Sequence, residues 1–170
     1  MSHVENKINW CLKKAERELK EGEKHRGLVE IEPNITKAKE HITKAEHNLK
    51  ATLYLQKGGY TDWCSSSIFY SIYHCFLAIA AKFGYESRNQ ECTFALISSL
   101  IEENKISLEA KDLEKVSSLE VNESHEASIV INLREEYQYN TKVSLSNNEY
   151  EEILNLAKKI LDKSKEIIEE

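Results

Sequence analysis

Residues 60–84, YTDWCSSSIFYSIYHCFLAIAAKFG, form the only long segment of the chain that is apolar on nearly every face. Charge enters only near its ends, as Asp62 and Lys82. A helix that is apolar all round is buried on all sides, and its many Ser, Cys and Ala residues would let neighbouring helices come close. Three serines, His74 and Asp62 make the segment too polar for a membrane span. The stretch therefore predicts the central helix of a soluble bundle.

Length and composition set the fold class. A chain of 170 residues predicts one domain, spanning 1–170. One proline and five glycines leave little room for the turns of a many-stranded fold, and Lys, Glu, Leu and Ala are abundant. We therefore expect an all-α protein, an up-and-down bundle of five to six helices.

The charge balance is mildly acidic and unevenly distributed. Twenty-three Lys and Arg residues against 29 Asp and Glu residues give a net charge of −6. This balance argues against strong non-specific binding to nucleic acid. Residues 1–57 hold 12 basic and 9 acidic side chains, a local charge of +3. A partner that meets the N-terminal helices would meet a mildly basic face.

The cysteines and the N-terminus predict a location in the cell. The four cysteines form no Cys-x-x-Cys pair, and three of them lie in apolar helical patterns. We expect reduced thiols and a cytoplasmic protein. The N-terminal residues MSHVENKINW lack the apolar core of a signal peptide, which agrees with that prediction.

Helical periodicity extends on both sides of the central segment. We expect a first helix from about residue 4 to residue 24, and a second from the cap Asn34 to Gly58-Gly59. Ser87 with Gln90, and Ser146 with Glu149, have the spacing of capping boxes. Residues 125–140 fit either a strand or a helix, and we favour the helix because a lone strand would have no partner. The other expected helices are 87–103, 107–119 and 146–168.

One face of the central helix carries Ser66, Tyr70 and His74, spaced four residues apart. Such a line could bind a ligand or relay a proton. Alternatively, the hydroxyls and the imidazole satisfy one another inside the core. We favour the second interpretation because no acidic partner is visible to tune the histidine. His41 and His47 point in different directions, and we expect both to be solvated.

The sequence predicts no metal or cofactor. Cys64 and Cys75 share a helix face but lie eleven residues apart, too far for one metal ion. The chain contains no Gly-rich phosphate loop, no Gly-x-Ser-x-Gly and no His-Glu-x-x-His.

Arg134 lies in LREEYQYN, close to Tyr137, Tyr139 and Asn140. An arginine beside aromatic side chains can hold a phosphate while bases stack on the rings. Equally, it can pair with a neighbouring glutamate or helix. The residues themselves leave both alternatives open.

The order of these parts resembles the HEPN family, small helical bundles named for nucleotide binding in higher eukaryotes and prokaryotes. The resemblance lies in ITKAEHNLKATLYLQKGGYTDWCSSSIFYSIYHCFLAIAAKFGYES, a helix after the turn, and LREEYQYNTKVSLSNNEYEEILNLAKKIL. It covers about residues 36–165, and leaves 1–33 as an N-terminal helix and connector. It implies a small helical bundle that forms a homodimer.

Many HEPN proteins are metal-independent ribonucleases, with an Arg followed four to six residues later by a His. In that chemistry the arginine holds the phosphate and the histidine exchanges protons. No arginine of this chain has a histidine at that distance, and a phenol is a poor substitute near neutral pH. The positions in question are Tyr139, Asn140 and Thr141 after Arg134, and Thr93, Phe94 and Ala95 after Arg88.

The resemblance therefore implies a non-catalytic HEPN protein. It would bind nucleotide or RNA, or pair with a small nucleotidyltransferase in a two-gene toxin–antitoxin-like module. One rival is a ribonuclease of altered active site that uses Arg134 with Tyr137 or Tyr139. Another is a structural helical module whose only ligand is a protein. The candidate ligand-binding residues are Arg134, Tyr137, Tyr139, Asn140, Arg88, Tyr70 and His74.

Overall fold

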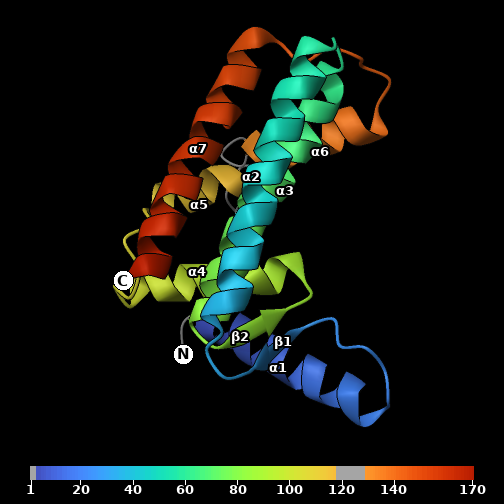
Figure 1. The fold of residues 1–170 in the computed structure, drawn as a ribbon. Helices are drawn as coiled ribbons and strands as arrows, with labels where there is room; N and C mark the ends of the chain where they lie inside the picture. The colour runs from blue at the N-terminus through green and yellow to red at the C-terminus, as the bar shows by residue number, and fades with distance from the viewer. Residues whose placement is uncertain (1–2, 118–128) are drawn as a thin grey trace.

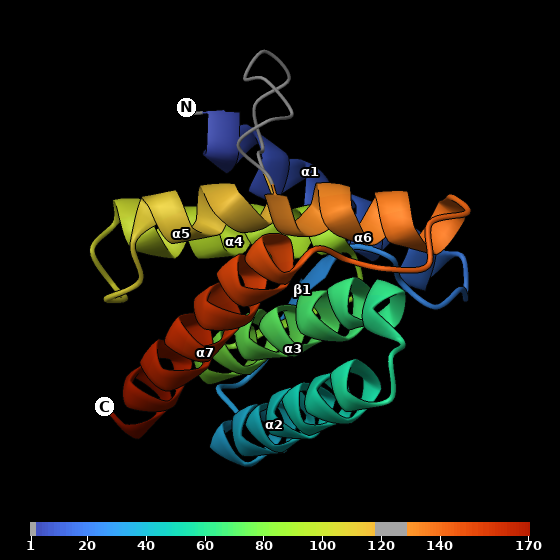
Figure 2. The ribbon, with the colours of Figure 1, turned by 90° about the horizontal axis from the view of Figure 1, so that it is seen from above.

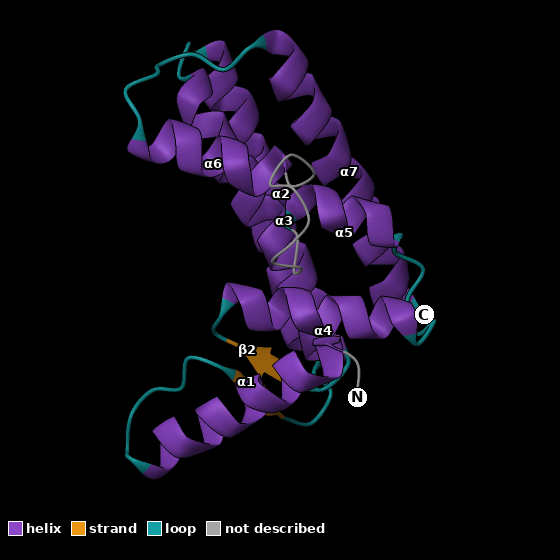
Figure 3. Cartoon of the chain, turned by 180° about the vertical axis from the view of Figure 1, so that it is seen from behind, coloured by secondary structure: helices purple, strands orange, loops and turns teal. Residues whose placement is uncertain are grey.

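The computed structural model describes residues 3–117 and 129–170, and within them the chain is almost entirely helical. The all-α prediction is confirmed, with seven helices in these ranges where five to six were expected. A two-stranded sheet is the only other regular structure there (Figure 3). The elements are α1 (His3–Lys20), β1 (Leu28–Glu30), α2 (Ile35–Lys57), α3 (Thr61–Lys82), β2 (Tyr85–Ser87), α4 (Gln90–Glu102), α5 (Ala110–Val116), α6 (Ile129–Tyr139) and α7 (Asn147–Glu169).

Helix α3 is the centre of the domain, as the sequence predicted. Twelve of its residues are buried, among them Phe69, Ile72 and Phe76. By length and composition it is the one described helix that could cross a membrane, but 67% of that window is buried inside the protein. An apolar helix covered by its own bundle is weak evidence for a membrane span.

The helices form two layers around α3. Helices α2, α3 and α7 lie side by side, and α4, α5 and α6 cross behind them (Figures 1 and 2). Small side chains bring α2 close to α3, because Ser71 donates to the carbonyl of Ala45 at 2.8 Å and the Thr52 and Ser67 hydroxyls lie 2.6 Å apart. On the other side, Lys82 donates to the carbonyl of Ile167 near the end of α7.

Helix α1 lies across α4 at the end of the bundle that carries the sheet (Figure 1). The expected connector contains β1, which pairs antiparallel with β2, Val29 opposite Glu86. A disulfide joins Cys11 of α1 to Cys92 of α4. The prediction of four reduced thiols is therefore wrong for this pair, whose residues lie 81 apart in sequence. Cys64 and Cys75 are free and buried, as expected.

The helix ends follow local sequence signals in part. Asn34 caps α2, and Ser146 with Glu149 forms the predicted capping box of α7. The predicted box at Ser87 is wrong, since Ser87 ends β2 and the Asn89 side chain caps α4. Residues 129–139 form a helix, as favoured for this segment. Residues 118–128, including the end of the expected helix 107–119, lie outside the described residues.

Gly84 ends the central helix and makes room for another segment. Its φ is +81°, and a Cβ built there would lie 2.7 Å from the carbonyl oxygen of Ile31. Ile31 in turn donates its amide to the Gly84 carbonyl at 2.8 Å. The turn after α3 is thereby fitted against the connector between α1 and α2.

We predict that Gly84→Ala lowers the free energy of unfolding by about 2–4 kcal/mol, from left-handed strain plus a clash with Ile31. Gly22→Ala is the matched control, because Gly22 has φ +77° but nothing within 4 Å of a Cβ. This control should cost only about 1 kcal/mol. Urea denaturation measures both values, and equal losses would show that the contact with Ile31 does not matter.

Candidate functional site

Arg134 lies in α6 with its guanidinium over the ring of Phe69, 4.2 Å from the ring centre. Its side chain is only 11% exposed. Among the described residues it pairs with one carboxylate, that of Glu135 at 4.0 Å from Nη2, and its buried Nε has no hydrogen-bond partner. The arginine therefore lies under the surface rather than in an open cleft, and the described residues balance its positive charge only weakly.

Phe69 connects this arginine to a set of aromatic rings on α3. The Phe69 ring lies 5.3 Å from Tyr70, edge to face, and 6.1 Å from Tyr73, nearly parallel. Tyr70 is exposed. Trp63, which lies two turns earlier on the same face of α3, is 59% exposed. Trp63 and Tyr70 thus present aromatic surface to solvent, while Arg134 is buried against the ring of Phe69.

The residues predicted around Arg134 separate in the structure. Tyr137 is buried, with Nζ of Lys142 lying 6.0 Å from its ring centre, so it cannot serve as an open stacking platform. Tyr139, at the end of α6, is 77% exposed. Asn140 is exposed as well, and its side-chain oxygen accepts a hydrogen bond from the Thr141 amide.

Arg88 does not join this group. It follows β2, at the end of the bundle where α1 lies (Figure 1). Its Nε donates to Glu86 at 3.0 Å, and that carboxylate also contacts His25. The fold gives Arg88 an acidic partner on β2, and its role as a candidate ligand-binding residue stays a prediction.

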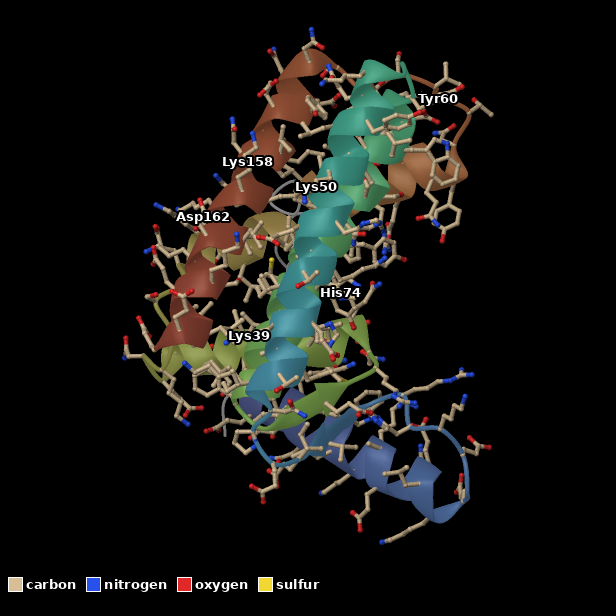
Figure 4. All side chains as sticks on the ribbon, in the orientation of Figure 1. Lys39, Lys50, Tyr60, His74, Lys158 and Asp162 are labelled. Carbon is tan, nitrogen blue, oxygen red and sulfur yellow. A yellow bond between two sulfur atoms is a disulfide. The ribbon has the colours of Figure 1, made fainter. Side chains whose placement is uncertain are left out.

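His74 pairs with His41 of α2, and not with the hydroxyls on its own helix. The two Nδ1 atoms lie 3.0 Å apart. His41 is half-buried, so the expectation that it is solvated is wrong, whereas His47 is exposed as expected. Figure 4 shows His74 at the side of α2, with Tyr60 farther along, where α2 turns into α3.

Burial keeps both imidazoles neutral near pH 7. Burial is the main cause that lowers the pKa of His41 from 6.5 to about 4. The charges of His74 and Lys37 lower this pKa further, and the charge of Glu40 raises it slightly. The pKa of His74 is also lowered, by burial and then by Lys44. In the neutral pair one ring donates its Nδ1 hydrogen and the other accepts it.

The described residues contain no group of three or more His, Cys, Asp or Glu side chains placed to hold a metal ion. The features that sequence inspection missed are Phe69 as the partner of Arg134, Trp63 as an exposed ring, and His41 as the partner of His74. Only Trp63 left a local signal, since it lies seven residues before Tyr70 in an otherwise buried helix.

A bundle of this kind, with an arginine near its C-terminal helix, is the architecture expected from the resemblance. The family model described as the HEPN domain matches residues 38–168 of the chain. The chain belongs to the HEPN domain family. No curated protein matches it. Helix α1 and β1 lie before the matched segment.

The buried histidine pair predicts a pH-dependent stability. The unfolded chain protonates His41 near pH 6.5, and the folded chain resists protonation until about pH 4. The unfolded state therefore binds more protons in this window, so stability falls as pH falls. Between pH 7 and pH 5, the unmodified protein should lose about 1–2 kcal/mol more unfolding free energy than the His41→Leu variant loses.

Urea denaturation at pH 7, 6 and 5 measures this slope. His47→Leu is the control, because His47 lies exposed on the same helix and should leave the slope as in the unmodified protein. An unchanged slope in His41→Leu would contradict the assignment of the pH dependence to the pair.

Proposed function

We propose that this HEPN-domain protein is non-catalytic and binds nucleotide or RNA phosphate at Arg134. The observation that carries the proposal is that the described residues balance the charge of this arginine only weakly. An ion pair at 4.0 Å and a cation–π contact with Phe69 offset only part of the cost of burying a guanidinium. A phosphate at the exposed edge of the side chain would supply the missing negative charge.

The surroundings of Arg134 fit a nucleotide better than a free anion. Tyr70 is exposed beside Phe69, and Tyr139 is exposed at the end of the helix that carries Arg134. Nucleobases stack on exposed aromatic rings with little sequence preference. The charge of Lys44, which lowers the pKa of His74, adds positive potential near this face of α3.

Proton transfer is the step that the described residues of the site do not support. A ribonuclease needs a group that exchanges a proton near neutral pH. The pKa values of His41 and His74 are lowered, and these two rings hydrogen-bond each other. The rival hypothesis, a ribonuclease that uses Arg134 with Tyr137 or Tyr139, is further weakened by the burial of Tyr137.

We predict that the protein binds a short single-stranded RNA weakly and with strong salt dependence, without turnover above background. Arg134→Met should weaken binding by about tenfold, because it removes the charge and keeps most of the side-chain volume. Its melting temperature should stay level or rise, since a buried charge is replaced by an apolar group of similar size. Fluorescence anisotropy and thermal denaturation measure the two effects.

Arg88→Met is the matched control, because Arg88 pairs with Glu86 of β2 rather than with Arg134 or Phe69, and the RNA binding of this variant should be unchanged. Cleavage of RNA by the unmodified protein, lost in Arg134→Met, would overturn the non-catalytic assignment and favour the altered-site enzyme. Gain of cleavage in Tyr139→His would fit a decayed nuclease site.

Homodimerisation is part of the proposal. The apolar stripe of α7 is buried within the monomer. Four exposed large apolar residues lie at the end of α2, in the turn and at the start of α3: Leu53, Tyr54, Tyr60 and Trp63. A surface of this composition fits a second copy or a protein partner such as a small nucleotidyltransferase.

A cytoplasmic location also stays a prediction.

We predict that the protein sediments as a dimer at micromolar concentration and that Trp63→Glu converts it to a monomer, because a buried unpaired charge opposes association. Trp10→Glu is the control, since Trp10 is similarly exposed on α1, away from this cluster. A monomeric unmodified protein would exclude the dimer and leave the structural interaction module, with a different partner, as the better hypothesis.

A further inference from the structure

The N-terminal segment is an addition to the HEPN domain, held to it by a covalent bond. Helix α1 and β1 precede residues 38–168, which the family model matches. Cys11 lies in α1 and Cys92 lies in α4, inside the matched segment. The disulfide is therefore a bond between the addition and the domain, rather than a bond within either part.

Few side chains of α1 are fully buried for a helix of this length. Cys11, Ala15 and Glu18 are buried, Ile8 and Leu12 pack half-buried against the core, and Trp10 and Leu19 stay about half exposed. Lys7 forms an exposed ion pair with Glu91 at 2.5 Å. A segment with few buried apolar contacts opens at low free-energy cost.

The strand that follows α1 adds little to this attachment. Strand β1 has three residues and pairs only with β2. His25, buried just before it, contacts Glu86 through Nε2 at 2.7 Å, but its buried Nδ1 has no hydrogen-bond partner. An unpaired buried nitrogen weakens this junction.

Between α1 and α4 lies an open cavity of about 390 Å³. Its walls include Ile8 on one side and Leu96 and Leu100 on the other. If α1 moved away, the side chains of Leu96 and Leu100 on this wall would become more exposed to solvent, beside the polar Ser99 and Glu103 of the same lining.

We propose that the Cys11–Cys92 disulfide is a redox clasp, whose reduction by a thioredoxin-class dithiol frees α1 and uncovers Leu96 and Leu100 of α4. One thiolate of the donor attacks a protein sulfur, the Cys11–Cys92 bond breaks and a mixed disulfide forms. The second donor thiolate releases the protein cysteine. Two electrons pass to the protein, which gains two thiol protons, and the donor leaves as a disulfide.

The structure sets the order of these steps. Both cysteines are fully buried and the intact bond keeps α1 on α4, so the donor reaches a sulfur atom only when the turns of α1 that flank Cys11 open locally. Few side chains of α1 are fully buried, which favours such a local opening. Reduction then removes the bond, and α1 can leave α4 without unfolding of the whole domain.

The other two cysteines do not interfere with the clasp. Cys64 and Cys75 lie buried on α3, and burial raises their thiol pKa values to about 11 and about 12. Almost no thiolate forms at these positions near neutral pH, so neither attacks the disulfide. The exchange is thus confined to Cys11, Cys92 and the external donor.

Hydrogen exchange with mass spectrometry on the full chain tests the clasp, before and after treatment with dithiothreitol. Alkylation of the native protein counts the thiols and shows whether the bond was reduced. We expect amide exchange in α1 and β1 to rise by about tenfold or more, while α2, α3 and α7 keep their protection. Cys11→Ser should exchange like the reduced protein, and Cys75→Ala, which keeps the disulfide, like the oxidised one.

Three results would overturn the proposal. Unchanged protection of α1 after proven reduction would show that non-covalent contacts alone hold the helix. A uniform rise across all helices would make the disulfide a bond of the entire fold. Failure of dithiothreitol to reduce the bond in the native protein would make it a permanent structural link. The reduced natural sequence still gives the answer if Cys11→Ser does not fold.

Discussion

The burial of α3, with twelve of its residues buried, is the constraint on which the rest of the structure depends. A helix without charge between Asp62 and Lys82 must be covered over most of its surface, and α2, α7 and α6 supply that cover. Small groups make the cover close. Ser71 satisfies its hydroxyl on the carbonyl of Ala45, which removes the cost of burying a polar group where two helices meet. The fold is thus set by one buried helix and by the neighbouring helices that can pack closely on it.

The sequence predicted what depends on neighbours in the chain. The apolar stripes of α2 and α7 and the caps at Asn34 and Ser146 are local patterns, and they were found. The three-residue strands are too short to show a period, and the Cys11–Cys92 pairing joins distant parts of the chain. Partners of this kind are fixed only when helices pack, so a pattern search cannot find them.

The candidate site was predictable to the same degree. Arg134 stood out as an arginine among aromatic residues, but its actual ring partner, Phe69, comes from another helix. His41 looked solvated because its surroundings in the sequence are polar, yet the packing of α2 on α3 places it against His74. Spacing along one helix indicates which side chains share a face. It does not indicate which neighbouring helix covers that face.

The contact between Arg134 and Phe69 has a consequence for how such sequences are interpreted. Phe69 is a core residue that also contacts Phe94 of α4, so the ring that holds the guanidinium in place belongs to the packing of the bundle. An arginine seated there has structural neighbours whether or not a histidine follows it. An arginine at this position is therefore, by itself, no marker of an enzyme.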